Sequence, residues 1–169
     1  VEGNPFARVF TATMLWEHRT EPVKPSEALS QRTVDAYRQI VRSFADQQVR
    51  VVNMSWRYGV ASYEGITVGA VDRAGQETSF STFGKTVAVH ANGFEVESLL
   101  PGGDRVKFSG TSMASPQVAN LAAKLFALKP ELTVAQVREA MIGTSERKGR
   151  VNLIHPRHAA QALGITLSP

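Results

Sequence analysis

The sequence contains no cysteine and no apolar run long enough to cross a bilayer. The absence of cysteine excludes disulfides, a thiol nucleophile and cysteine ligands for a metal. A membrane-spanning helix needs about twenty mostly apolar residues, so no membrane partner is expected. No stretch resembles a signal peptide, and the chain opens on Val1 rather than on methionine. We interpret that opening as the mark of a processed chain, a fragment or an incomplete sequence.

The charge balance is mildly basic, with 19 Lys and Arg against 15 Asp and Glu, a formal charge of +4 and a pI near 9.7. Most basic residues are scattered, and one cluster occupies residues 147–150. Such a cluster either contacts phosphate groups or forms a solvated loop between helices. We interpret it as the loop and expect no nucleic-acid partner, although the pI alone keeps a nucleic-acid-binding module as a weak alternative.

Short apolar strands mixed with helical periodicities predict an α/β fold with a largely parallel sheet. Apolar side chains near helical spacing predict an amphipathic helix over residues 26–48. A Thr133–Gln136 capping box opens another helix, and Asn92-Gly93 marks a turn. The predicted strands are residues 8–14, 49–55, 66–71, 87–91 and 94–99, and the other predicted helices are residues 112–128, 133–142 and 155–163.

The connection between the predicted strands 49–55 and 66–71 is unusually short. It spans ten residues, Trp56 to Gly65, whereas a parallel crossover usually needs about a dozen or more. Ten extended residues reach at most ~33–36 Å, which allows a return along a strand but leaves no room for a helix. Either these strands are not ordinary parallel neighbours, or sequence is missing between Trp56 and Ile66.

The segment Gly110 to Pro116 has the chemistry of a nucleophilic serine at the start of a helix. Gly110 permits a tight turn and the close approach of a substrate carbonyl. At a helix N-terminus, Ser112 would lie among free amide groups that stabilise negative charge, and its own N–H could donate to an oxyanion. The alternative is that Ser112 serves only as a helix N-cap.

The octet Ser109 to Pro116 resembles the serine motif of the subtilisin-like serine proteases, and the resemblance extends over residues 49–169. It implies a three-layer, mostly parallel α/β fold and hydrolysis of polypeptides through an acyl-enzyme on Ser112. In that family the strand matching residues 52–55 binds the substrate backbone by β-addition. The resemblance thus implies substrate-binding roles for four residues, Ser55, Trp56, Arg57 and Gly110. Trp56-Arg57 departs from the small, glycine-containing family sequence, which leaves the pocket wall undefined.

Three other parts of the family's catalytic machinery have no counterpart in the sequence. The family's aspartate is followed by Thr or Ser and Gly, its histidine lies in a His-Gly-Thr-His helix, and its oxyanion asparagine lies in an Ala-Gly-Asn stretch. The aspartates occur in helix or turn contexts, and no histidine has the family context. His155 and His158 share one helix face, but no third ligand is evident, so we expect surface histidines and no metal site. The residues considered are Asp35, Asp46, Asp72, Asp104, His18, His90, His155 and His158.

These absences affect whole segments rather than single residues. We therefore interpret residues 1–169 as a partial subtilase catalytic domain that starts after the histidine helix and lacks a segment between Trp56 and Ile66. The predicted activity is that of a serine endopeptidase; the alternative is a non-catalytic pseudoprotease or truncated fragment. A further predicted partner is the missing part of its own domain. No cofactor is identified, and calcium is compatible with the resemblance alone. The compartment stays unknown, and the resemblance implies an extracellular or periplasmic one.

Overall fold

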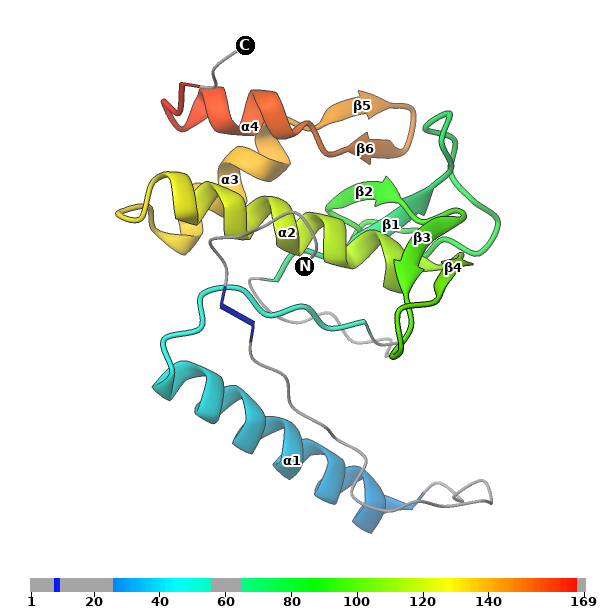
Figure 1. Cartoon of the computed structure of the whole chain (residues 1–169), viewed down its shortest axis with the longest axis vertical. Coiled ribbons are helices and arrows are strands. Elements are labelled where there is room, and N and C mark those ends of the chain that lie inside the picture. Colours follow the sequence, from blue (N-terminus) through cyan, green and yellow to red (C-terminus); the bar gives the residue numbers. More distant parts are fainter. Residues whose placement is uncertain (1–7, 10–25, 56–64, 167–169) are drawn as a thin grey trace. The chain divides into compact units, whose positions relative to one another are not determined.

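A computed structural model of the chain describes residues 8–9, 26–55 and 65–166 (Figure 1). The chain forms two compact units: among the described residues, 8–9 and 26–50 belong to the smaller one, and 51–55 and 65–166 belong to the larger one. Most of the predicted strand 8–14 and the link from Trp56 to residue 64 lie outside the described residues. The proposed gap between Trp56 and Ile66 is therefore untested and stays a prediction.

The smaller unit is built on helix α1, Glu27–Asp46, which confirms the predicted helix 26–48 with slightly tighter ends. Ser26 is the N-cap, and its side chain accepts a hydrogen bond of 3.1 Å from the amide of Leu29. This satisfies one of the amides that the first turn leaves without a helical partner. No residue of α1 is buried among the described residues.

The larger unit contains a four-stranded sheet in the order β1-β2-β6-β5. Strand β1 (Val68–Val71) pairs in parallel with β2 (Val89–Asn92), and Val68 lies opposite Val89. Strand β6 (Val151–Leu153) is also parallel to β2, and β5 (Glu146–Lys148) is antiparallel to β6. The central strands are rich in Val and Ala, as expected of parallel strands covered on both faces. The predicted strands 66–71 and 87–91 are thus confirmed with small shifts.

The prediction of a strand at residues 49–55 is wrong, because these residues belong to no strand or helix. A strand needs a neighbour to accept and donate its backbone hydrogen bonds. No strand in the described ranges pairs with residues 49–55. Their apolar side chains favoured the strand in the sequence, but the pairing that would make one is not supplied by the rest of the described chain.

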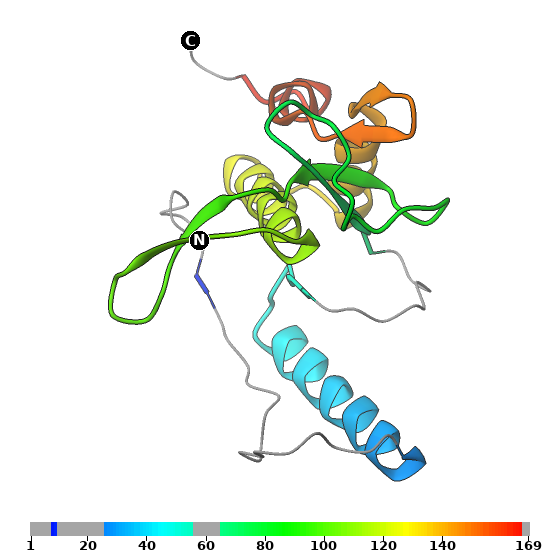
Figure 2. The same ribbon diagram turned by 90° about the vertical axis from the view of Figure 1, so that its right-hand side faces the viewer.

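Two hairpins complete the strands of this unit. Strands β3 (Val96–Leu99) and β4 (Arg105–Phe108) form a two-stranded sheet that extends away from α2 (Figure 2). The sequence predicted a strand at residues 94–99, which corresponds to β3, but it did not predict β4. The other hairpin joins β5 to β6 through Gly149, whose φ of 62° lies in the left-handed region that glycine favours.

The basic cluster at residues 147–150 lies in the β5–β6 hairpin, so its assignment to a loop between helices is wrong. Arg150 forms an ion pair with the carboxylate of Glu77, whose side chain is 8% exposed. The guanidinium carbon of Arg150 also lies 5.6 Å from the centre of the Phe83 ring. Short polar strands give little hydrophobic signal, which explains why the hairpin was missed. Arg147 and Lys148 remain exposed.

Three helices pack with the sheet and with one another to form the core (Figure 1). Helix α2 (Thr111–Leu128) packs on β1 and β2, while α3 (Val134–Gly143) packs on both α2 and α4 (Pro156–Ala162). All three predicted helices are confirmed, including the capping box of Thr133 and Gln136. Leu125 and Met141 are 1% exposed at the centre of this packing. In the described part of the chain, no helix has both the length and the apolarity required to span a bilayer.

Candidate functional site

Ser112 is the second residue of α2, in the helix-start position that the motif predicted. The N-cap is Gly110, which contributes no side-chain hydrogen bond, and the amide of Met113 donates to the carbonyl of Gly110 at 3.0 Å. Ser112 is half-buried, and its Oγ has no hydrogen-bond partner among the described residues. Its hydroxyl is therefore not occupied by capping the helix, in contrast to the alternative that Ser112 is only an N-cap.

The turn before Ser112 is held against the end of strand β2 by Gly93. The amide of Gly110 donates to the carbonyl of Gly93 at 2.8 Å. A Cβ at Gly93 would lie 2.6 Å from the Cβ of Ala70 and 2.7 Å from the carbonyl oxygen of Gly110. Only glycine fits this approach. The serine therefore lies beside the carboxyl ends of the parallel strands, where α/β proteins commonly place their ligands.

Pro116 lies inside α2 as its sixth residue, just beyond the first turn. Proline has no N–H, and it therefore leaves the carbonyl of the residue four positions earlier, Ser112, without its helical donor. Ser55 supplies a replacement, because its Oγ donates to the carbonyl oxygen of Ser112 at 3.3 Å. The hydroxyl of Ser55 thus stabilises the backbone at Ser112.

Asn53 strengthens this contact between the segment 53–55 and the start of α2. Its Nδ2 donates to the Oγ of Ser55 at 3.1 Å, and its Oδ1 accepts from the Oγ of Ser115 at 2.7 Å. The structure therefore brings together Ser55, Gly110 and Ser112 of the predicted site. The other two predicted residues, Trp56 and Arg57, lie outside the described residues. Asn53 is not among the residues predicted from the sequence, although it is the one amide side chain in the segment resembling the substrate-binding strand.

His90, the histidine nearest in sequence to the serine motif, forms hydrogen bonds elsewhere in the sheet. It lies on β2 and is 2% exposed, and its Nδ1 accepts the amide of Asn152 at 3.2 Å. Side chains alternate between faces along a strand, and Ala91 packs in the core cluster with Ala114 of α2. His90 therefore points to the opposite face of the sheet from α2, and no hydrogen bond joins it to Ser112 within the described ranges.

The surroundings of His90 favour its neutral form. Burial lowers the pKa of His90 below its ordinary value of 6.5, and the nearby Glu77 carboxylate opposes that shift only in part. The Nε2 atom lies 3.8 Å from Oε1 of Glu77, and that oxygen has no hydrogen-bond partner in the described part of the chain. A neutral imidazole enclosed in this way fits a structural role in the sheet.

Two of the described aspartates, Asp72 and Asp104, belong to turns at the ends of strands. Oδ1 of Asp72 accepts the amides of Ala74 and Gln76 at 2.8 and 2.9 Å, which makes it part of the turn after β1. Asp104 closes the β3–β4 loop through its carbonyl, which accepts the amide of Leu100. No aspartate in the described ranges forms an ion pair with a histidine. The described residues therefore place the serine, but no histidine–aspartate pair beside it.

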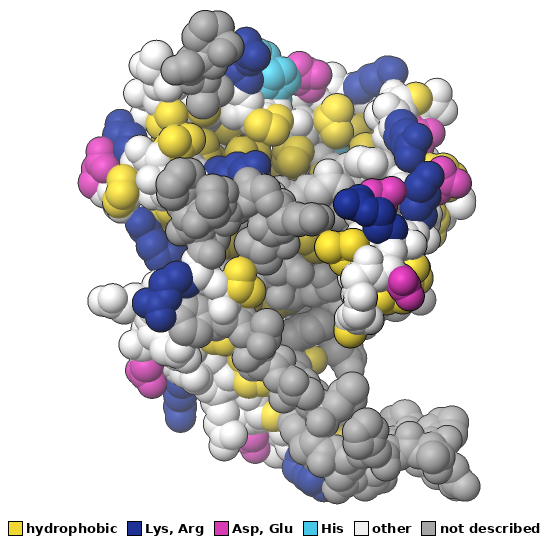
Figure 3. All heavy atoms as spheres, in the orientation of Figure 1, with side chains coloured by type: hydrophobic (Ala, Val, Ile, Leu, Met, Phe, Trp, Pro, Cys, Tyr) yellow, Lys and Arg dark blue, Asp and Glu magenta, His cyan; other side chains and the backbone are white. Residues whose placement is uncertain are grey.

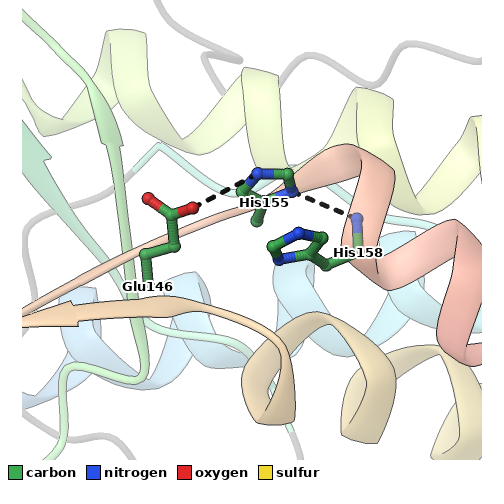
Figure 4. Close-up of side chains that lie close together, drawn as sticks. All are labelled: Glu146, His155 and His158. Atoms are coloured by element: carbon green, nitrogen blue, oxygen red, sulfur yellow. Dashed lines mark hydrogen bonds and ion pairs between the residues drawn. The ribbon is translucent and has the colours of Figure 1, made fainter.

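Within the described ranges, the one cluster of three or more ionisable ligand side chains consists of Glu146, His155 and His158 (Figure 4). Ca²⁺ takes six to eight oxygen ligands, chiefly carboxylates and carbonyls, and this cluster offers a single carboxylate. The cluster therefore does not match the ligand preference of calcium.

Comparison with known proteins identifies the family. The model of the subtilase family, peptidase S8, matches residues 57–161. Subtilisin from Bacillus pumilus is 44% identical over 84 residues, which are 50% of this chain and 30% of that protein. Subtilisin NAT from Bacillus subtilis subsp. natto is 41% identical over 101 residues, 57% of this chain and 26% of that protein. The matched region therefore spans between a quarter and a third of these relatives.

Comparison of the structure with solved structures leads to the same family as comparison of the sequence. A mutant of the protease domain of PatA superposes with a TM-score of 0.54 at 27% identity, and the match covers 59% of this chain and 40% of that one. The predicted subtilisin-like α/β fold with a mostly parallel sheet is therefore confirmed. Because the family model covers more than half of the sequence and includes the serine motif, the chain belongs to the subtilase family.

Proposed function

We propose that this chain is the serine-bearing part of a serine endopeptidase that hydrolyses peptide bonds of polypeptides through an acyl-enzyme on Ser112. One observation carries the proposal: Ser112 lies in the first turn of α2 with a hydroxyl that no described residue occupies. The amides of that turn and the helix dipole favour negative charge. They would stabilise the oxyanion of a tetrahedral intermediate formed on the Ser112 hydroxyl.

The segment 53–55 supports a substrate-binding role beside this serine. It is tied to the first turns of α2 by the hydrogen bonds of Ser55 and Asn53. An extended peptide laid along it would pass close to Ser112, in the manner of a strand added to an edge. We include Gly110 in this site, because its lack of a side chain leaves room for the substrate carbonyl. Trp56 and Arg57 belong to the same proposal on the basis of the resemblance alone.

The base and the carboxylate are the parts that this site still requires. A serine hydroxyl becomes a nucleophile only when a base accepts its proton, and the base is in turn oriented by a third group. We propose that both groups come from segments of the catalytic domain other than the described residues. The second candidate is a non-catalytic subtilase, and one observation favours it: none of the histidines in the described ranges, His90, His155 and His158, hydrogen-bonds to Ser112.

Labelling with a fluorophosphonate distinguishes the two candidates, because this reagent reacts with an activated serine. The protein is produced from its own complete gene, labelled and mapped by peptide mass spectrometry. The Ser112→Ala variant removes the nucleophile, and Ser98→Ala, at an exposed position of β3, is the matched control. We expect the label on Ser112 in the unmodified protein and in the control, and none in Ser112→Ala. A folded but unlabelled protein would support the non-catalytic alternative.

A further inference from the structure

Three potential metal ligands meet where strand β5 and helix α4 approach each other. Glu146 is the first residue of β5, His155 is the N-cap of α4, and His158 lies in the first turn of that helix. One ligand atom from each side chain can be chosen so that all three lie within 4.8 Å of one another. Figure 4 shows the carboxylate of Glu146 directed at the His155 ring, with the His158 ring beside it.

His155 caps helix α4 in this structure. Its Nδ1 accepts the amide of His158 at 3.1 Å, which is the N-cap hydrogen bond of α4. In a neutral imidazole one nitrogen carries the proton and the other accepts, so the proton lies on Nε2 here. A metal-binding histidine donates its second N–H to another group, so metal binding at Nε2 requires the proton to leave Nε2 for Nδ1 and the N-cap hydrogen bond to be released.

The distance between Glu146 and His155 matches a coordination polyhedron. Nε2 of His155 lies 3.3 Å from Oε1 of Glu146. In a tetrahedral zinc site, with Zn–N and Zn–O bonds near 2.0–2.2 Å, neighbouring ligand atoms are separated by roughly 3.4 Å. The two atoms of this ion pair are therefore separated by nearly the distance that two ligands of one zinc ion would have.

His158 is the ligand that must move. Its ring stacks on that of His155 with centroids 3.5 Å apart and an angle of 10° between the planes. Two stacked rings cannot both direct a lone pair at one ion, so His158 must change its rotamer. Its side chain is exposed, and exposed side chains change rotamer rapidly and at little cost.

We propose that Glu146, His155 and His158 form a binding site for Zn²⁺ or a similar first-row divalent ion. Two imidazoles and a carboxylate match the ligand preference of such ions and not that of Ca²⁺. Three protein ligands leave a fourth position for water. The ion would link the start of β5 to the first turn of α4, two elements that are otherwise joined through the short strand β6.

The site is accessible to an ion from solution. The side chains of Glu146 and His155 are 57% and 28% exposed. Figure 3 shows histidine and acidic atoms side by side on this surface, with basic side chains next to them. Arg157 lies between the two histidines in sequence and is itself exposed, so solvent and salt screen its repulsion of a cation. This proposal does not depend on the activity of Ser112.

The test uses the metal-stripped protein and measures Zn²⁺ affinity by calorimetry, together with the visible absorption of bound Co²⁺. Three variants remove one ligand each: Glu146→Gln, His158→Gln and His155→Asn, where asparagine keeps an N-cap side chain for α4. The matched control is Glu139→Gln, at an exposed position of α3 outside the cluster. The thermal midpoint with and without Zn²⁺ provides a second readout.

We expect one Zn²⁺ per chain, a higher thermal midpoint with zinc, and a Co²⁺ spectrum typical of a four- or five-coordinate site. Each ligand variant should weaken Zn²⁺ binding by at least about tenfold and alter the Co²⁺ spectrum, while Glu139→Gln should leave both unchanged. Equal Zn²⁺ affinity in the original protein, Glu146→Gln and His158→Gln would overturn the proposal, as would the absence of binding at millimolar zinc. The cluster would then serve only as an ion pair and a helix cap.

Discussion

At the scale of single residues, the contacts of the serine segment follow from the limits of particular side chains. Pro116 cannot donate to the carbonyl of Ser112, and Ser55 does so in its place. Because Gly93 has no side chain, the carbonyl of Gly110 can lie close to it; the Cβ of a larger residue would occupy that space. His90 fills the space over Gly69 on the opposite face of the sheet, where a Cβ at Gly69 would lie 2.5 Å from the imidazole.

Replacing Ser55 by alanine should loosen the start of α2. The carbonyl of Ser112 would lose the hydroxyl that donates to it, at a cost of about 0.5–1.5 kcal/mol in the free energy of unfolding. Because Ser55 is exposed, water can partly replace the hydroxyl and keep the loss near the lower value. Ser55→Thr retains the hydroxyl and should lose less. Chemical denaturation of the two variants checks the expectation, and equal losses in both would contradict it.

The buried His90 predicts a loss of stability on mild acidification. Its pKa is lowered in the folded state, so below pH 6.5 the unfolded chain binds a proton that the folded chain does not. This contribution to stability is complete above pH 6.5 and is lost as the pH falls from 6.5 towards the folded-state pKa. The slope reaches at most about 1.4 kcal/mol per pH unit.

The variant His90→Asn isolates that contribution, since its side-chain oxygen can still accept the amide of Asn152. The neighbouring charges of Glu77 and Arg150 remain in both proteins. Urea denaturation from pH 8 to pH 5 should give a free energy of unfolding that falls more steeply in the original chain than in the variant. If the free energy of unfolding depends on pH in the same way in both proteins, His90 has the same pKa in the folded and unfolded states.

At the scale of elements, helix α2 is positioned by packing on strands β1 and β2, and a capping box stabilises the first turn of α3. Helix α2 packs on β1 and β2 through Ala114 and Val118, which are 0% and 4% exposed. The capping box at Thr133 satisfies two backbone amides, one through its own Oγ1 at 3.2 Å and one through Gln136 at 2.8 Å.

Replacing Gly93 by alanine should displace the turn that presents Ser112. The new Cβ would lie 2.6–2.7 Å from Ala70 and from the backbone of Gly110, so one of the elements must shift. Overpacking of this kind costs typically ~1–3 kcal/mol in the free energy of unfolding. The displaced turn should also lower the rate of fluorophosphonate labelling at Ser112. The matched control is Gly143→Ala, because a Cβ there meets no atom within 4 Å.

The cap of α3 provides a separate prediction about an element boundary. Thr133→Ala removes the Oγ1 acceptor and should reduce the free energy of unfolding by about 1 kcal/mol. Thr133→Ser keeps the acceptor and should cost much less. Thermal unfolding followed by circular dichroism compares the two variants. A serine variant as unstable as the alanine variant would show that the methyl group of Thr133, rather than the cap, stabilises this position.

At the scale of the whole molecule, the described chain holds the serine but no base aligned with it. In a subtilisin, removing either the serine or the histidine lowers kcat by about 10⁶, and roughly 10³–10⁴ over water remains from binding and the oxyanion hole. Since the described residues bring no histidine to Ser112, residues 1–169 alone should lack useful proteolysis.

Hydrolysis of a peptide anilide measures that expectation directly. Purified 1–169 and its Ser112→Ala variant should show the same negligible turnover, whereas the product of the complete gene should hydrolyse the substrate if our proposed function is correct. Robust turnover by 1–169 that disappears in Ser112→Ala would mean that a histidine of this chain supplies the base. Because His90 points away from α2, a variant of His18, which lies outside the described residues, would then be the first to assay.

The sequence by itself determined the family, the α/β class and the position of Ser112 at the start of a helix. These features depend on local patterns: the octet Ser109 to Pro116, the apolar runs of the parallel strands and the helical spacing of α1 and α2. Such patterns can be recognised without knowing the rest of the fold, because neighbours in sequence favour the helix or strand conformation at these positions.

Only the tertiary structure decided which distant residues meet. The pairing of Ser55 with the carbonyl of Ser112 joins positions 57 residues apart. The apolar segment 49–55 had a strand pattern but no strand partner in the described ranges, and the polar strand β5 formed because β6 lies next to it. Likewise, Glu146 joins His155 and His158 in the proposed metal site only because the hairpin brings β5 to α4. Hydrogen bonds and ligand sets of this kind depend on spatial proximity, which no local periodicity encodes.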